Sequence, residues 1–531
     1  MSSGRTTTAT RSRDDSHVHE TSAREHRGPA RLLSRPRLDR IGAPEVADPR
    51  NPWIGICAVT VLAALLRLPT LGLQSYDFDE GGTLYVIHGS FTHMLHGVAQ
   101  HESTPPVYYV LAWTWAQGLG TGETGLRLLS ALAGVATVPV AYAAGRTLTS
   151  HRIGVAAAAF VATSPYLVFY SQEARSYALL TLLSTTGVLC CARAIRSPAG
   201  RPLALWAAAS ITAIATHYFA LFPWIGETVA LAVFGAPRRL LARWVGAVGL
   251  ASVPLLLLAR HQAAAGHASW IGASSLAQRL RVTAETFSLG ATFKGSLPHS
   301  VLAVCAVFAL VIAATIAAAA VLLVRRATPR ERRAAEIFGL IAALSIAVPL
   351  AGALGPADYF IDKNLIPFLP LLALVLAAGL VCRHAGRVGA VGAVALALAG
   401  AALTVLSFEA HSMRRPDVRQ ASAQLGAPVR ERILVFIPRW RILLEHYQGT
   451  LEDLPRTGAR VSEVDVFTTA RSLPRDTVPP AFRLVRVQDG DTFTVFDFRS
   501  SVPRTVTPDH VGRRRFSESG LQPVAVVQKP R

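Results

Sequence analysis

The chain has 531 residues, of which 51% are hydrophobic and only 16% charged, and its mean hydropathy is +0.36. An average soluble domain carries about 25% charged residues, so this composition excludes an ordinary soluble protein. The net charge of +20 would fit a nucleic-acid-binding protein, but most arginines lie in short clusters between apolar runs, which is typical of membrane proteins. No nucleic-acid partner is therefore expected.

The first part of the chain is rich in Ser, Thr and Arg and poor in apolar residues. A segment of this composition cannot bury enough apolar surface to fold. Residues 1–50 are therefore predicted to be a disordered basic tail on the cytoplasmic side. The apolar run at residues 53–73 follows, and we expect it to be an uncleaved membrane anchor.

Apolar runs of roughly 18–25 residues, each long enough to cross a bilayer, recur from about residue 53 to residue 408. Basic clusters between alternate runs should face the cytoplasm. This pattern predicts about eleven transmembrane helices in residues 51–408, with the N-terminus in the cytoplasm and the C-terminus outside. The apolar run at 105–119 is too short to cross comfortably, so we expect a juxtamembrane or re-entrant helix on the outer side.

After residue 411 the charges and prolines return. Strand-like runs occur at 433–437, 464–468, 482–487 and 492–498, and Asp489-Gly490 between the last two favours a hairpin turn. A helix is expected within 430–447. Residues 409–503 are predicted to form a small extracytoplasmic α+β domain, and residues 504–531 a disordered tail.

Polar side chains gather in the junctions that this topology places outside. A hydroxyl that accepts a transferred group needs a positioned base, usually a carboxylate or a histidine, and a leaving phosphate needs cations or hydrogen-bond donors. If the substrate is carried on a lipid, both kinds of group must lie at the membrane surface. The outer carboxylates, lysine and arginines meet this requirement, although the same residue types also occur as ordinary loop residues.

Metal and disulfide chemistry has little support in the sequence. The cysteines lie inside or beside apolar runs, and none has metal-ligand spacing with histidines. His93 and His96 are three residues apart, a spacing that some metal sites use, but two histidines of a juxtamembrane helix are the simpler interpretation. No metal and no cofactor are predicted.

Several short motifs occur in order between about residues 60 and 385. Residues 66–80 end in Asp77-Phe78-Asp79-Glu80, and Glu102-Ser103-Thr104-Pro105-Pro106 comes next. Then follow Arg127-x-x-Ser130-x-x-x-Gly134, Ser171-Gln172-Glu173-Ala174-Arg175-Ser176-Tyr177, and Lys363-Asn364-Leu365. Their order and spacing resemble the GT-C glycosyltransferases, which include the protein O-mannosyltransferases and the lipid A aminoarabinose transferases.

The resemblance implies an all-α polytopic GT-C fold in a bacterial plasma membrane. It also implies an inverting transfer of a sugar from a polyprenyl-phosphate carrier to an acceptor hydroxyl on the outer face. Mannose-like and arabinose-like sugars both fit, and the acceptor is a glycan, a lipid or a protein. The expected partners are this donor, the acceptor and membrane lipids.

The family's motifs assign roles to individual residues of this chain. The Asp of the Asp-Glu pair is the base for the acceptor hydroxyl in such enzymes, which corresponds to Asp79. The expected site consists of the catalytic pair Asp79 and Glu80; Asp77, Glu102 and His101, which orient the base or the acceptor; Lys363, Arg175 and Arg127 at the donor phosphate; and Gln172, Tyr177, His217 and Tyr218, which line the cavity.

Some of these residues have alternative interpretations. Thr104 occupies a position often held by His or Lys in the family and cannot supply a charge, and His101 is near enough in sequence to compensate. In the alternative interpretation, Arg175 forms an ion pair with Glu173 or another outer acid. Arg127 is alternatively a contact at a helix end. Arg67, near the outer end of the first span, would simply extend its charged end to the membrane surface.

A different class of function also fits a chain of this kind. A flippase for lipid-linked sugars or a secondary transporter would place ionisable residues near the middle of the bilayer, often beside helix breaks. The ionisable residues singled out above fall at outer helix ends instead, which favours the enzyme.

Overall fold

The computed structural model describes residues 52–266, 269–290, 299–355, 358–409, 415–473, 477–490, 492–511 and 522–530. The tail predicted at residues 1–50 lies outside them. A bundle of helices extends to residue 409, and a six-stranded sheet with short helices follows from residue 415.

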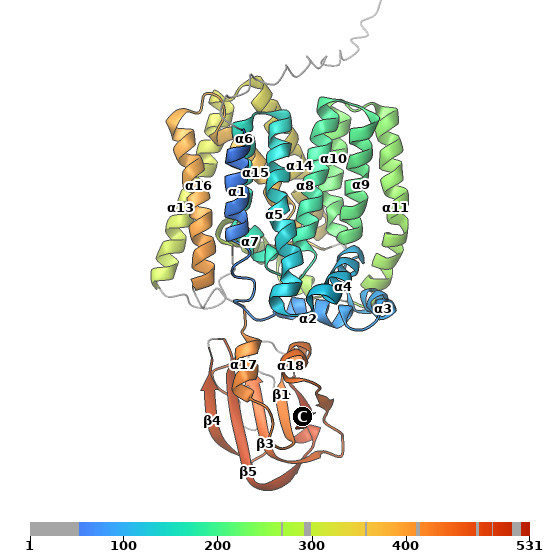
Figure 1. Ribbon diagram of the computed structural model, residues 1–531, viewed down its shortest axis with the longest axis vertical. Coiled ribbons are helices and arrows are strands. Elements are labelled where there is room, and N and C mark those ends of the chain that lie inside the picture. The colour runs from blue at the N-terminus through green and yellow to red at the C-terminus, as the bar shows by residue number, and fades with distance from the viewer. Residues whose placement is uncertain are drawn as a thin grey trace, which may run out of the picture. The chain divides into compact units, whose positions relative to one another are not determined.

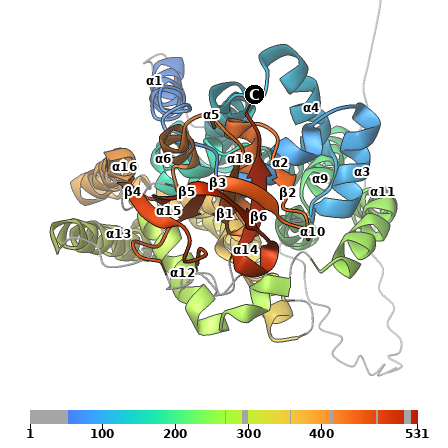
Figure 2. The same cartoon turned by 90° about the horizontal axis from the view of Figure 1, so that it is seen from below.

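The main helices of the bundle run side by side (Figure 1). They are α1 (Pro52–Leu65), α5 (Glu123–Leu148), α6 (His151–Thr163), α8 (Tyr177–Arg196), α9 (Gly200–Thr216), α10 (Leu221–Phe234), α11 (Arg238–Ala264), α13 (His299–Arg326), α14 (Pro329–Ala353), α15 (Phe368–Leu380) and α16 (Gly386–Glu409). Helices α13 and α16 lie together on one side of the bundle and α11 on the opposite side, as Figures 1 and 2 both show.

Within the described residues, six helices are long and apolar enough to cross a membrane: α5, α8, α11, α13, α14 and α16. Helix α6 and the short α7 (Pro165–Ser171) meet at a bend of 61° and together make a seventh candidate. The apolar helices α1, α10 and α15 are shorter. The predicted polytopic helical architecture is confirmed, while the number of about eleven crossings stays a prediction.

The bend between α6 and α7 has a local cause in the sequence. Pro165 disfavours the helical conformation for the residue before it, and Ser164 accordingly adopts an extended conformation with ψ of 117°. The break places the end of α7 and the residues after it beside the first turn of α2, where the candidate site lies.

Small residues let the long helices pack closely. A Cβ on Gly154 of α6 would lie 2.7 Å from the carbonyl oxygen of Tyr142 on α5, and one on Gly400 of α16 would lie 2.5 Å from the carbonyl oxygen of Thr163. Any larger side chain would separate these backbones. Close packing through glycine and alanine is common between membrane helices.

Shorter helices gather at one end of the bundle, near the start of α5 (Figure 1). They include α2 (Phe78–Ile87), α3 (Phe91–His101) and α4 (Val107–Leu119). The apolar run at 105–119 forms α4, whose 13 residues are fewer than the roughly 17–25 that a crossing needs. Further along the chain lie η1 (Tyr218–Ala220), η2 (Ser269–Ala273), α12 (Leu276–Leu289) and η3 (Asp362–Leu365).

The sheet has the strand order β2-β6-β1-β3-β5-β4. Its strands are β1 (Arg432–Phe436), β2 (Glu452–Asp453), β3 (Ala459–Thr468), β4 (Arg483–Asp489), β5 (Thr494–Val506) and β6 (Val524–Gln528). Strands β1 and β3 are parallel, and the other pairs are antiparallel. Helices α17 (Val418–Leu425) and α18 (Arg441–Gln448), with the turns η5 (Pro438–Trp440) and η6 (Pro508–His510), complete the α+β fold.

The sequence prediction failed at the end of the chain. Residues 504–531 were expected to be a disordered tail, but β5 extends to Val506, and β6 pairs with β1 near the middle of the sheet. Strand β6 is short, and it pairs with β1 from far along the chain, so its apolar run Val524-Ala525-Val526-Val527 has no strand next to it in sequence to mark it as part of the sheet.

The sheet and the helical bundle share one hydrophobic cluster. It contains Leu84 and Val86 of α2 together with Leu443 of α18 and Val435 of β1. Gly81 lets the two helices approach, since a Cβ there would lie 3.2 Å from the Leu443 side chain. The described residues of the bundle and of the sheet accordingly belong to one compact unit.

Candidate active site

The first turn of α2 carries three carboxylates. Asp77 is the N-cap residue, and it forms a capping box with Glu80: the Asp77 side chain accepts from the backbone inside the helix, while its own N–H donates to Glu80 Oε2 at 3.0 Å. Such reciprocal bonds fix the start of a helix. They also fix the backbone that carries the intervening Asp79.

Asp79 is half-buried and forms an ion pair with Lys363 of η3. The distance from Lys363 Nζ to Asp79 Oδ2 is 2.7 Å, and the exposed fractions of the two side chains are 19% and 32%. Burial acts to raise the pKa of the Asp79 carboxyl, but Lys363, Arg175 and Arg415 together bring it below its usual value. Asp79 is therefore an ionised carboxylate that solvent or a substrate can still reach.

Glu80 has a different environment from its neighbour. It is fully buried, and Arg127 binds it through two bonds, Nε to Oε1 at 2.7 Å and Nη2 to Oε2 at 2.6 Å. Arg415 Nη1 donates to Oε2 at 3.0 Å, and the backbone N–H of Ala174 donates to Oε1 at 2.8 Å. Since both oxygens are occupied, Glu80 connects α2 with other segments and does not face open space.

The spaced motif on α5 lies along one face of that helix. Arg127 donates its remaining N–H groups to the carbonyls of Leu71, Gln74 and Ser75. Ser130 Oγ donates to the carbonyl of Arg175 at 3.2 Å. These bonds use all five guanidinium donors of Arg127, so the geometry favours the helix-end contact over the phosphate-binding role expected for it.

The last motif residue, Gly134, is required by close packing. A Cβ at this position would lie 2.2 Å from Ser171 Oγ. Ser171 also accepts from Arg67 Nε at 3.1 Å. Arg67 is buried rather than extended to the membrane surface, and it donates to the carbonyls of Ala63, Val161 and Ala162.

Arg175 pairs with Glu102 rather than with Glu173. Its Nη1 and Nη2 atoms lie 2.8 and 3.2 Å from the two Glu102 carboxylate oxygens. Gly82 of α2 lies against this pair, since a Cβ there would be 3.2 Å from Glu102 Oε1 and 3.5 Å from Arg175 Nη1. The Nε atom of Arg175 is buried and has no hydrogen-bond partner among the described residues.

The residues between α7 and α8 complete the charged cluster. Burial, together with the charges of Asp79 and Glu80, raises the pKa of Glu173 to about 8, although Arg415 acts in the opposite direction. Gln172 Nε2 donates to the carbonyl of Arg67 at 2.8 Å. Gln172 thus stabilises the turn, and it also lines a small pocket beside the cluster.

Aromatic rings form a continuous row beside Lys363. Successive rings lie 4.8 to 5.7 Å apart along the series Tyr166, Tyr170, Tyr177, His217, Phe219 and Tyr359. Burial, together with Arg175 and Lys363, lowers the pKa of His217 to about 3. His217 is therefore a neutral ring of this row, and its expected cavity-lining role stays a prediction.

Two expected residues are not brought into the charged cluster. The hydroxyl of Tyr218 donates to Gln262 Oε1 at 2.9 Å and connects η1 to α11. His101 is exposed at the end of α3 and packs edge-on against Tyr85, with ring centroids 5.1 Å apart. It therefore shows no sign of replacing the charge missing at Thr104, whose hydroxyl bonds to that of Tyr109.

Arg415 was not expected from the sequence. Its side chain contacts Glu80, and it lines a small pocket beside the cluster. The other lining residues are Thr70, Gln74, Arg127, Val168, Phe169, Gln172, Gly290, Ser407 and Phe408. It lies 335 residues after Glu80 and outside any motif, so no sequence signal could have found it.

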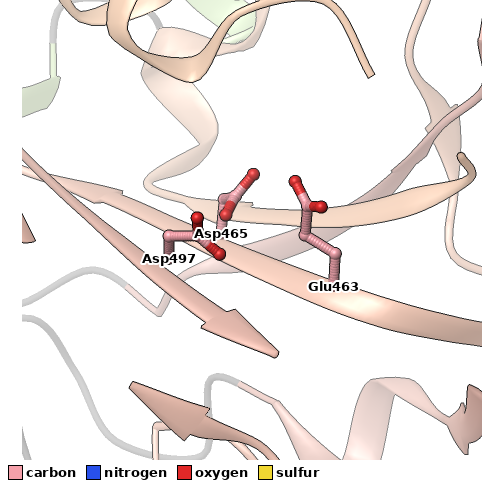
Figure 3. A group of neighbouring side chains, drawn as sticks. All are labelled: Glu463, Asp465 and Asp497. Carbon is pink, nitrogen blue, oxygen red and sulfur yellow. The ribbon is translucent and has the colours of Figure 1, made fainter. Parts of the chain in front are cut away.

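In the described part of the chain, one group of three residues has the spacing of metal ligands: Glu463, Asp465 and Asp497 (Figure 3). Asp465 and Asp497 are directly opposite each other on β3 and β5. Arg432 lies 3.0 Å from Asp465 and 3.4 Å from Glu463, and Arg499 lies 3.2 Å from Asp497. Because guanidinium groups already neutralise these carboxylates, we interpret the group as an ion-pair network within the sheet.

Comparison with known proteins places this geometry in context. Residues 103–260 match the dolichyl-phosphate-mannose-protein mannosyltransferase family. The fold is similar to that of ArnT from Cupriavidus metallidurans in the apo state, with a TM-score of 0.51 and 12% identity over 84% of this chain and 97% of that one. For the same protein bound to undecaprenyl phosphate, the TM-score is 0.51 and the identity 13%, over 84% and 98% of the two chains. No significant sequence similarity links the chain to a protein of curated function.

Proposed function

We propose that the chain is a membrane glycosyltransferase of the GT-C superfamily, and that it transfers a sugar from a polyprenyl-phosphate carrier to an acceptor hydroxyl. The names of both relatives support the donor class. One is the dolichyl-phosphate-mannose-protein mannosyltransferase family, and the other is ArnT, whose structure was determined with undecaprenyl phosphate. The location proposed is the bacterial plasma membrane, with the site on the outer face.

The ion pair between Asp79 and Lys363, 2.7 Å apart, is the observation that carries this proposal. The reaction needs a base for the acceptor hydroxyl and a cation for the leaving phosphate. Here an ionised carboxylate and an ammonium group lie side by side in a half-buried position, outside the long helices. A carrier lipid in the membrane could reach such a position with its phosphate.

In the proposed step the acceptor hydroxyl oxygen attacks the anomeric carbon of the donor. Its proton passes to Asp79, the new glycosidic C–O bond forms, and the bond from the anomeric carbon to the phosphate oxygen breaks. The electron pair of that bond stays on the phosphate, whose charge Lys363 and Arg175 stabilise. Attack from the face opposite the phosphate inverts the anomeric configuration.

Other expected residues have supporting roles in this proposal. Glu80 and Arg127 position α2, and Glu102 positions Arg175 by its bidentate bond. Tyr177 and His217 line the cavity. Asp77 is the helix cap beside the base.

The test is a transfer assay with the purified full-length protein in detergent. Radiolabelled polyprenyl-phospho-sugars of the mannose and arabinose types serve as donors, and a membrane extract serves as the acceptor source. Asp79→Asn should lower transfer by about 10²–10⁴-fold, the usual contribution of a general base. The productive donor would identify the sugar.

Asp77→Asn is the matched control, because asparagine also caps helices well. It should keep most of the activity. Wild-type transfer by Asp79→Asn would refute the role of Asp79, and loss of transfer only in Asp77→Asn would move the base to that residue. A folded wild-type protein that transfers no sugar from any donor would favour the flippase or transporter and call for a lipid-flipping assay.

A further inference from the structure

Arg415 lies where the chain passes from the last long helix to the sheet, and its side chain is 5% exposed. Its Nη1 atom donates to Glu80 Oε2 at 3.0 Å and to the carbonyl of Gln172 at 3.2 Å. Nη2 lies 3.7 Å from Glu173 Oε2, and the guanidinium stacks on Phe169 at 4.3 Å from the ring centroid. One side chain therefore contacts both α2 and the α7–α8 junction.

The backbone around Arg415 is held as firmly as its side chain. Its N–H donates to Gln74 Oε1 at 2.9 Å. Ser75 Oγ donates to the carbonyl of Pro416 and accepts from the N–H of Val418, both at 3.0 Å. The segment leading into the sheet is thus bound to the residues directly before α2.

Arg415 lies among several acidic side chains. Four carboxyl groups converge here: Asp77, Asp79, Glu80 and Glu173, and burial raises the pKa of Glu173 to about 8. Arg415 acts to lower the pKa of each of them. Burying like charges together is costly unless cations or hydrogen bonds compensate them.

We propose that Arg415 is a positioning residue of the transferase site: its guanidinium joins Glu80 to the α7–α8 junction and is the shared counter-ion of the carboxylates around Asp79. This inference rests on the proposed function, since it gives the base a further cation besides Lys363 and Arg175. It also gives the sheet a role, because the segment entering the sheet supplies that cation.

The groups that face Asp79 come from several elements. Removing Arg415 leaves the others in place, so the expected change in Asp79 follows from the loss of one positive charge. The groups that remain around Asp79 are Lys363 from η3; Glu173, Arg175 and Tyr177 from the α7–α8 junction and the start of α8; and Asp77 from the cap of α2.

The experiment compares pH profiles of kcat/KM for full-length wild type, Arg415→Gln and Arg415→Lys between pH 4.5 and 8. Wild type should be nearly flat at its acidic end, because Asp79 ionises below this range. Loss of a neighbouring cation typically raises a carboxyl pKa by on the order of one unit. At pH 4.5 Arg415→Gln should therefore lose up to about threefold more activity than at pH 7.5, and Arg415→Lys should restore most of the wild-type profile.

Arg419→Gln is the matched control. Arg419 belongs to the same segment and binds Glu123 and the carbonyl of Gly72 at 3.3 and 3.2 Å, but none of the four carboxylates. Its replacement loosens the same attachment and should leave the acidic end of the profile unchanged. Thermal unfolding in detergent verifies that each variant is folded.

The outcomes separate the two proposals. If wild type transfers no sugar, the proposed function fails. If wild type transfers and Arg415→Gln has the wild-type profile, or loses activity equally at every pH, the counter-ion role is refuted. If Arg415→Gln does not fold, the test rests on the pH profile of Arg415→Lys. A profile that matches wild type at its acidic end supports the counter-ion role, and a profile displaced to higher pH refutes it.

Discussion

Asp79 and Glu80 are neighbours in sequence but have opposite surroundings. Asp79 is half-buried beside one ammonium, whereas Glu80 is fully buried between two guanidinium groups. A reactive base must be reachable, and a structural carboxylate must be fully hydrogen-bonded. In the proposed function the base is therefore Asp79, while Glu80 has the surroundings of a structural carboxylate.

Glu80→Gln should destabilise the fold. Breaking a buried pair by removing one charge costs about 3–5 kcal/mol, because Arg127 and Arg415 would remain buried without a full counter-charge. Thermal unfolding in detergent measures the loss. Glu336→Gln is the control, since the Glu336–Arg333 pair is exposed and such pairs contribute about 0–1 kcal/mol. Equal unfolding temperatures for the two variants would contradict the assignment.

Gly82→Ala tests the pair between Arg175 and Glu102. The added Cβ would lie 3.2 Å from Glu102 Oε1, and overpacking of this kind costs about 1–3 kcal/mol. We expect a several-fold rise in KM for the donor, because Arg175 must move from its position. Gly118→Ala on α4 has nothing within 4 Å of the new Cβ and should leave KM unchanged. A normal KM in Gly82→Ala would argue against a donor contact by Arg175.

The sequence anticipated these residues unevenly. Asp79, Lys363 and Arg175 stood out because each lies in a polar junction next to an apolar run, and the fold brings all three together. That every guanidinium N–H of Arg127 is already hydrogen-bonded could not be foreseen, since its partners are mostly backbone carbonyls. Arg415 was missed because its contact with Glu80 spans almost the whole chain.

At the level of elements, lengths were harder to predict than positions. Arg67 and the break before Pro165 divide apolar stretches that read as single runs, so α1 and α6 end earlier than hydropathy indicates. In the sheet, the Asp489-Gly490 turn correctly joined the antiparallel strands β4 and β5. Strand β6 pairs with β1 from far along the chain, and such long-range pairing leaves no local pattern.

Helix α10 carries a carboxylate that sequence analysis did not single out. Glu227 is buried, and it accepts a hydrogen bond from Trp206 Nε1 of α9 at 2.6 Å. Gly187 of α8 makes room for it, since a Cβ there would lie 3.0 Å from both carboxylate oxygens. Glu227 therefore connects three neighbouring helices of the bundle.

Two replacements of Glu227 distinguish the contribution of its hydrogen bond to stability from that of its charge. Glu227→Gln keeps an acceptor for Trp206 and should unfold near the wild-type temperature. Glu227→Leu leaves the buried indole N–H unpaired, at a cost of about 1–3 kcal/mol. Thermal unfolding of both variants in one detergent is the measurement. A Gln variant as unstable as the Leu variant would mean that the ionised carboxylate itself is required.

For the whole molecule, the sheet and the helical bundle are joined through the residues around α2. Tyr447 of α18 illustrates this: its hydroxyl accepts from the N–H of Tyr76 at 3.1 Å and donates to Glu123 at 2.8 Å. Arg419 binds the same carboxylate. Helices α17 and α18 of the C-terminal α+β fold therefore contact the segment that precedes α2 and the start of α5, which a detached cap would not do.

Tyr447→Phe tests this connection with a minimal change. It removes one hydroxyl and leaves the Tyr76 N–H without its acceptor, a loss of about 1–3 kcal/mol when the group is buried. Because the loss falls at the junction, we expect faster hydrogen exchange at residues 74–80 and a smaller effect within α5. Tyr142→Phe, which removes a hydroxyl bonded to His151 between α5 and α6, is the control and should leave exchange at 74–80 unchanged. Equal exchange at 74–80 in wild type and Tyr447→Phe would show that the sheet does not constrain the start of α2. Substitutions at the interface between the sheet and the helical bundle, other than those of Arg415, would then be expected to leave sugar transfer unchanged.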